Sequence, residues 1–176
     1  MHAAGTYGIV DPECVSDYVV SSYTPTIRTL LRDNPLRPSP CKMVVVTQPN
    51  TPDQPPLPDT VAELGRIKAH VPNQELVSLV GGSVKDVISH LSTASIAHFA
   101  CHGRQHADNP LESALMLGDG PLKVSDIIQH SVSNGILAFL SACHTAAGDQ
   151  NHPDEVLHLG SSLLFAGFRG VVATMW

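Results

Sequence analysis

The amino-acid sequence predicts a single α/β domain built on a parallel sheet. The chain has 176 residues, 43% of them apolar, which is enough for one core and short for two domains. Two apolar runs, 95–101 and 136–143, are bounded by turn residues, as expected for strands buried on both faces of a parallel sheet. Strand-like and helix-like patterns also alternate along the chain, and this order favours parallel strands joined by right-handed crossovers.

The N-terminal part of the chain carries weaker signals. Residues 1–40 contain scattered aromatic side chains and a proline-rich end, and only a short helix over 26–32 is predicted there. Residues 43–47 form a β-branched apolar run, which is typical of a strand. The proline-rich stretch 48–59 follows it, and because proline disfavours both helix interiors and central strands, this stretch predicts a surface loop.

Two helices separated by a strand are predicted next. Thr60 and Glu63 have the spacing of a capping box, and apolar residues then recur at roughly helical spacing. A strand over 76–80 is expected to end at the following pair of glycines. Ser83 is the expected N-cap of a second helix, which continues to Leu91 with apolar residues on one face.

The C-terminal half repeats the alternation. A short strand over 115–117 is followed by a Gly-Asp-Gly turn and by a helix that Ser125 is expected to cap. A further helix is expected to begin at Asp154 and to stop at Gly167, with a final strand over 171–175.

Charge and cysteine content narrow the classes of function. The net charge of −6 offers no basic surface for nucleic acid or anionic lipid, and no apolar run approaches the roughly 18 residues that span a bilayer. The N-terminus lacks the pattern of a secretory signal, so a cytoplasmic protein is expected. The four cysteines form no CxxC pair and no dense framework, which favours reduced thiols: Cys14, Cys41, Cys101 and Cys143.

Two strand ends carry residues suited to catalysis. In a parallel sheet, ligands bind beyond the carboxyl ends of the strands, where the first long run leads to His102 and Gly103 and the second leads to Cys143. If the two strands are neighbours, a thiol nucleophile and an imidazole base emerge at one edge. An imidazole can take the thiol proton near neutral pH, and the backbone N–H groups of Gly103 and Cys143 could bind a tetrahedral oxyanion.

Several sequence blocks resemble the CHAT family of caspase-related peptidases. They are HFACHG, NPLESALMLGDGPLKVSDI, LAFLSACHTAAGD, DEVLHL and AGFRGVVATMW, and the match is strongest from Ile96 to Trp176. The resemblance implies a caspase-like fold, in which a mainly parallel sheet is flanked by helices on both faces. It also implies that His102 and Cys143 are the catalytic dyad of a cysteine endopeptidase that acts on polypeptides and needs no cofactor or metal.

The resemblance also sets expectations about domain organisation. Residues 1–40 are expected to be a poorly defined N-terminal segment, and 41–176 a caspase-like CHAT domain that lacks its C-terminal elements, because the family continues beyond Trp176. An attached helical-repeat module or a regulatory protein is the expected partner. The sequence departs from bacterial members of the family at His144, where those members commonly carry Glu.

The same residues also fit roles other than catalysis. Cys101 alternates to the face opposite His102 and is expected in the core, and His98 is expected to be a hydrogen-bonded core histidine. A catalytically inactive peptidase-like domain that only binds a protein segment is the alternative to an enzyme. A zinc site made by His98, His102, Cys143 and His144 is a third hypothesis, which the absence of CxxC and HExxH spacings disfavours.

Overall fold

The structure is a computed structural model that describes residues 18, 41–104, 106, 109–141 and 156–173. The chain divides into two compact units, 1–32 and 33–176. Tyr18 is the described residue of the first unit, and it is exposed. The helix expected over 26–32 lies outside the described residues.

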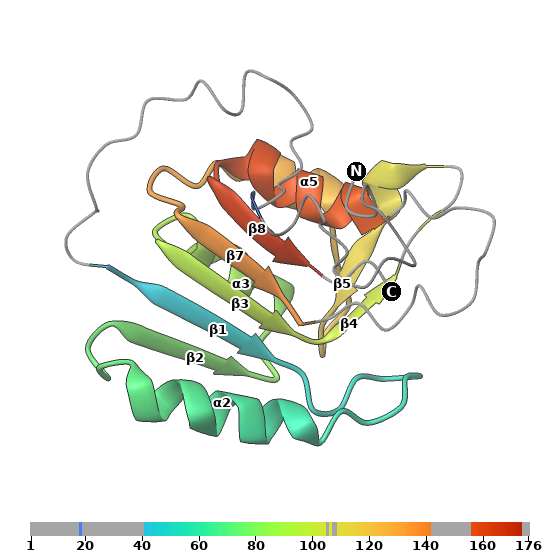
Figure 1. Ribbon diagram of the computed structural model, residues 1–176. Helices are drawn as coiled ribbons and strands as arrows, with labels where there is room; N and C mark the ends of the chain where they lie inside the picture. Colours follow the sequence, from blue (N-terminus) through green and yellow to red (C-terminus); the bar gives the residue numbers. More distant parts are fainter. Residues whose placement is uncertain (1–17, 19–40, 105, 107–108, 142–155, 174–176) are drawn as a thin grey trace, which may run out of the picture. The chain divides into compact units, whose positions relative to one another are not determined.

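The second unit is built on a five-stranded sheet whose strands all run parallel (Figure 1). The order across the sheet is β2-β1-β3-β7-β8. The strands are β1 (Met43–Thr47), β2 (Leu76–Val80), β3 (Ile96–Ala100), β7 (Leu137–Leu140) and β8 (Gly170–Ala173). The α/β class and the mainly parallel sheet expected from the sequence are confirmed.

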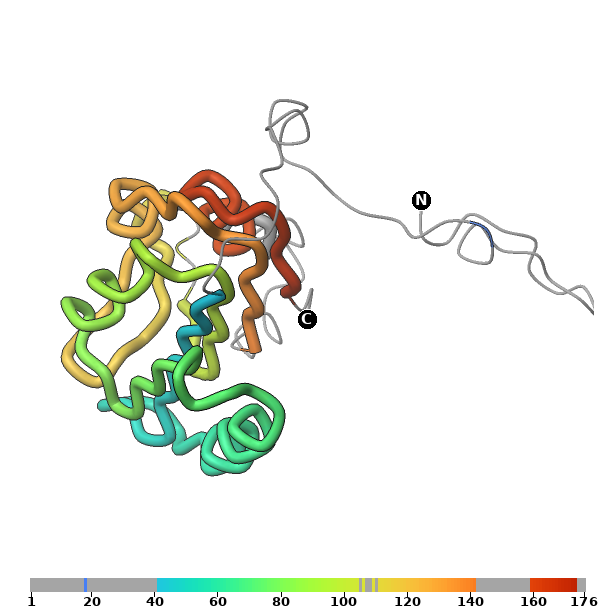
Figure 2. The backbone as a smooth tube through the Cα atoms, turned by 90° about the vertical axis from the view of Figure 1, so that its left-hand side faces the viewer, coloured from blue at the N-terminus to red at the C-terminus, as the bar shows by residue number. Residues whose placement is uncertain are grey.

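Helices cover both faces of this sheet. They are α2 (Asp59–His70), α3 (Val84–Leu91), α4 (Val124–Gln129) and α5 (Val156–Ala166). The core cluster joins Val44 and Val46 of β1 to apolar residues of α3, α4 and α5, whereas Val45, which alternates to the other face, lies on the side of α2. Figure 2 shows α2 and α3 on opposite sides of β1.

A second, three-stranded antiparallel sheet stands at the carboxyl edge of the first. It consists of β4 (His102–Arg104), β5 (Ala114–Met116) and β6 (Pro121–Lys123), with a 3₁₀ turn at Pro110–Glu112 before β5. The chain leaves β3 and enters β4 at Cys101, whose side chain is buried in the core as expected. The sequence predicted only one short strand in this region, so β4 and β6 were missed.

Helix starts agree with the sequence in one case and differ in two. Ser83 caps α3, because its Oγ accepts a hydrogen bond of 3.1 Å from the backbone N–H of Asp86. The capping box expected at Thr60 and Glu63 is wrong. α2 begins at Asp59, so Thr60 is already inside the helix, and its hydroxyl donates to the Leu57 carbonyl instead. Ser125 is not the cap of α4, which begins one residue before it.

The end of α5 agrees with the sequence, whereas the burial of β7 does not. Gly167 terminates α5 as expected, and its φ of +127° explains why a glycine stands there. β7 is not buried on both faces, because Phe139 is 37% exposed on the side of the sheet away from the core cluster. Asp154 lies outside the described residues. Among the described helices, none is both long and apolar enough to cross a bilayer.

Candidate active site

The two strands that lead to the candidate dyad are neighbours in the sheet. β3 and β7 pair in parallel with Phe99 opposite Leu140, and the N–H of Ser141 donates to the Phe99 carbonyl at 2.8 Å. The strands that lead to His102 and Cys143 are therefore adjacent, as the expected catalytic pair requires. Cys143 follows Ser141 by two residues and lies outside the described part of the chain, as does His144.

His102 lies at the start of β4 with only 7% of its surface exposed. Its Nε2 is 2.7 Å from the main-chain carbonyl oxygen of Pro55. Because a carbonyl oxygen can only accept, this contact requires the proton to be on Nε2. In the neutral ring the other nitrogen, Nδ1, then carries the lone pair and can accept a proton.

Pro55 belongs to the proline-rich loop that follows β1, and two backbone hydrogen bonds close this loop on itself. The Leu57 N–H donates to the Pro49 carbonyl at 2.8 Å, and the Gln54 N–H donates to the Thr51 carbonyl at 3.2 Å. Since proline rings also fix φ, the carbonyl that meets His102 is held in place. The sequence predicted the loop but not its contact with His102. The feature that could have indicated this contact is that the loop follows β1, the strand paired with β3.

Gly103 follows His102 in β4 and stands opposite Leu115 of β5. The residue is buried. Its expected role as an oxyanion donor, together with the N–H of Cys143, stays a prediction.

Comparison with protein families identifies the class of domain. The chain matches the CHAT domain family over residues 9–176. The chain belongs to the CHAT family. This family is caspase-like and related to peptidases, in agreement with the resemblance of the sequence motifs and with the parallel sheet. A search of curated proteins found no match.

Four residues before His102, this CHAT domain also contains a buried histidine. His98 of β3 is 6% exposed, and its ring stacks on Phe139 with centroids 5.1 Å apart and an interplanar angle of 12°. Its Nε2 is 3.1 Å from Oε1 of Glu63, although the atoms are not aligned as a hydrogen bond. Burial lowers the pKa of His98, and the Glu63 carboxylate only partly opposes that effect. The expected burial is confirmed, and the polar group that faces Nε2 is the Glu63 carboxylate.

Glu63 also reaches the strand that leads to Cys143. Its second carboxylate oxygen accepts a hydrogen bond of 3.3 Å from the Ser141 hydroxyl. One side chain of α2 thus contacts β3 through His98 and the end of β7 through Ser141. The sequence had assigned Glu63 to a helix cap, so this bridging position was missed.

The zinc hypothesis is not decided by the fold of the CHAT domain. Within the described ranges, no three His, Cys, Asp or Glu side chains are grouped closely enough to hold a metal ion. Two of the four residues in that hypothesis, Cys143 and His144, lie outside those ranges, so it stays untested.

Proposed function

We propose that this CHAT domain is a cysteine endopeptidase in which Cys143 is the nucleophile and His102 the general acid and base. The observation that carries the proposal is the contact of 2.7 Å between His102 Nε2 and the Pro55 carbonyl. It leaves Nδ1 as the proton acceptor, and it resembles the arrangement in which a third group orients the base of a catalytic pair.

The topology supports the pairing of these two residues. His102 follows Phe99 by three residues and Cys143 follows Ser141 by two, and the backbones of Phe99 and Ser141 are hydrogen-bonded to each other. An extended chain spans at most about 3.6 Å per residue, so covalent geometry limits the separation of the Ser141 and Cys143 Cα atoms to about 7 Å.

The reaction would proceed through an acyl-enzyme. His102 Nδ1 takes the thiol proton, and the thiolate of Cys143 attacks the peptide carbonyl carbon. The oxyanion accepts hydrogen bonds from the N–H groups of Gly103 and Cys143. The imidazolium then protonates the departing amine, and water activated by His102 hydrolyses the thioester to release the acid and restore the thiol.

The proposal extends to regulation and to partners. The substrate is a polypeptide, and an attached helical-repeat module or a regulatory protein controls access to the site. The rival function, a peptidase-like domain that binds a polypeptide without cleaving it, is an outcome of the following experiment.

Labelling with a peptide chloromethyl ketone, with the modified residue located by mass spectrometry, tests the dyad. Label should fall on Cys143 in preference to the other three thiols, because in the proposed dyad Cys143 alone has a neighbouring imidazole that stabilises its thiolate. His102→Ala should lower the rate at least tenfold, whereas the control Cys41→Ala should leave it unchanged. Equal labelling of all four thiols in the folded chain would overturn the dyad. Peptide binding without labelling would support the inactive domain. Stoichiometric zinc in the purified protein that is lost in both Cys143→Ala and His102→Ala would support a metal site.

A further inference from the structure

The proline-rich loop and helix α2 form one continuous segment, 48–70, that contacts both sides of the candidate dyad. In the loop, the Pro55 carbonyl oxygen is 2.7 Å from Nε2 of His102. In the helix, the Glu63 carboxylate meets the imidazole of His98 and the hydroxyl of Ser141. The candidate base and the strand that leads to the candidate nucleophile are therefore held by the same stretch of chain.

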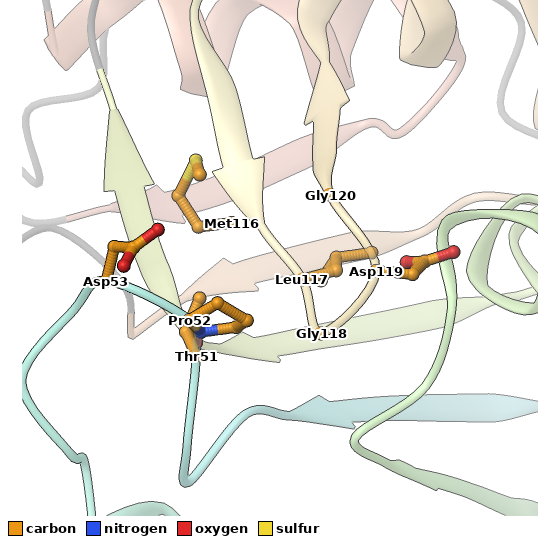
Figure 3. Close-up of a pocket in the computed structure, with 8 residues that line it drawn as sticks. All are labelled: Thr51, Pro52, Asp53, Met116, Leu117, Gly118, Asp119 and Gly120. Atoms are coloured by element: carbon orange, nitrogen blue, oxygen red, sulfur yellow. The ribbon is translucent and has the colours of Figure 1, made fainter.

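The loop half of this segment lies against the second sheet. The loop and the turn between β5 and β6 enclose a pocket of about 250 Å³. Figure 3 shows Thr51, Pro52 and Asp53 of the loop at this pocket, together with Met116 at the end of β5. Met116 stands opposite His102 in the β4–β5 pair. The loop thus borders the ribbon that presents the imidazole, and α2 continues from the C-terminal end of the loop.

His98 determines where the Glu63 side chain lies on the sheet. The His98 imidazole is buried, its ring stacks on Phe139 of β7, and its Nε2 is 3.1 Å from Oε1 of Glu63. The Glu63 side chain is 31% exposed. A ring nitrogen in an apolar site favours a polar neighbour, because a nitrogen without one loses its interactions with water and gains nothing in return. The carboxylate is therefore held over the junction of β3 and β7.

Ser141 follows β7 on the way to Cys143, and it is tied to its surroundings by two hydrogen bonds. Its N–H donates to the Phe99 carbonyl at 2.8 Å, and its hydroxyl donates to Oε2 of Glu63 at 3.3 Å. The first bond joins the main chain to β3, and the second joins the side chain to α2. A thiol and its base react only within hydrogen-bond reach of each other, so the direction of the chain two residues before Cys143 affects their encounter.

We propose that Glu63 is a positioning residue for the nucleophile, which acts through Ser141 and sets the direction in which the chain leaves β7. This inference rests on the proposed function, because it assigns Cys143 the role of nucleophile. His98 holds the carboxylate in place, and the carboxylate holds the Ser141 hydroxyl. Because Pro55 belongs to the same segment, the orientation of the base and the approach of the nucleophile are linked through the loop and α2.

The rate at which a peptide chloromethyl ketone labels Cys143 in the full chain measures this positioning. Glu63→Ala and Ser141→Ala should each lower the rate at least threefold. The double variant should be within twofold of the slower single variant, because both changes remove the same hydrogen bond. Glu63→Gln should restore most of the rate that Glu63→Ala loses, since its amide oxygen still accepts from the Ser141 hydroxyl. The control Glu75→Ala makes the same change just before β2, which β1 and β3 separate from β7, and should leave the rate unchanged.

Several results would overturn the proposal. A double variant that shows the product of the two single effects would mean that Glu63 does not act through Ser141. Unchanged rates in both single variants, an equal loss in the Glu75 control, or a Gln variant as slow as the Ala variant would also contradict it. Ser141 is exposed, so Ser141→Ala should unfold in urea like the wild type, and its labelling rate tests the proposal even if Glu63→Ala is less stable.

Amide hydrogen exchange separates this inference from the proposed function, because it needs no chemistry at the thiol. Exchange in the segment 141–145 should be at least fivefold faster in Glu63→Ala and in Ser141→Ala than in the wild type. Faster exchange in both variants, in a chain whose Cys143 is not labelled preferentially, would contradict the peptidase and retain the link between α2 and the end of β7. Preferential labelling of Cys143 with unchanged exchange in both variants would overturn the link alone.

Discussion

Replacing Gly167 by Ala should destabilise the domain strongly, because two features of its position exclude a side chain. Its φ of +127° is unfavourable for an L-residue, and a Cβ there would collide with the Val132 carbonyl oxygen. Phe168, the next residue, is fully buried in the core, so the backbone cannot move away without disturbing packing. Backbone strain of about 1–2 kcal/mol and overpacking of about 1–3 kcal/mol give an expected loss of about 2–5 kcal/mol in the free energy of unfolding.

Gly65 provides a matched control for the same chemical change. It is exposed in the middle of α2, its φ is not positive, and a Cβ there would meet nothing within 4 Å. Gly65→Ala should therefore stabilise the domain by about 0.5–1 kcal/mol, since alanine favours helix interiors. Urea unfolding at pH 7 measures both effects, and Gly167→Ala should lower Tm by at least about 4 °C in a chain of this length. A loss below about 1 kcal/mol for Gly167→Ala would refute the described geometry of the α5 terminus.

Two further predictions concern a helix cap and a buried histidine. Ser83→Ala should cost about 1 kcal/mol of unfolding free energy in urea titrations, because the Asp86 N–H at the start of α3 loses its acceptor; a neutral result would mean that water replaces the cap. Burial lowers the pKa of His98 in the folded state, so the unfolded chain binds the proton more readily, and stability should fall as pH drops below about 6.5. His98→Gln should reduce this decline between pH 7.5 and 5.5, and parallel pH curves for the two proteins would contradict the effect of burial.

The main sheet could be predicted because its signals are local. The apolar runs around Val44, Phe99 and Ala138 are short, β-branched or aromatic in part, and bounded by turn residues. Ser83 and Gly167 were also found correctly, since a cap and a positive φ depend on residues within one turn of the helix end.

Two strands of the second sheet, β4 and β6, were missed because they are too short to carry a pattern. β4, β5 and β6 have three residues each. Period-two alternation needs about four residues or more to be recognised. Glu63 was misassigned for a related reason: a capping-box spacing is visible in sequence, whereas its contacts with His98 and Ser141 depend on how α2 lies on the sheet.

At the candidate site, the sequence located His102 through its position at a strand end, but it did not indicate the partner of Nε2. That partner is a main-chain carbonyl, and a carbonyl leaves no mark in the amino-acid types. The pocket beside His102 was missed because it forms where the loop meets the β5–β6 turn, two segments more than 60 positions apart, from Thr51 to Met116.

The contact between Pro55 and His102 places a constraint on loop length. A side-chain substitution at position 55 leaves the carbonyl oxygen in the chain, so the residue type there can vary while the acceptor remains. Inserting or deleting one residue between Pro49 and Leu57 would instead move that oxygen by up to about 3.6 Å, beyond the reach of a hydrogen bond. Variation among related chains should therefore change the composition of this loop more freely than its length.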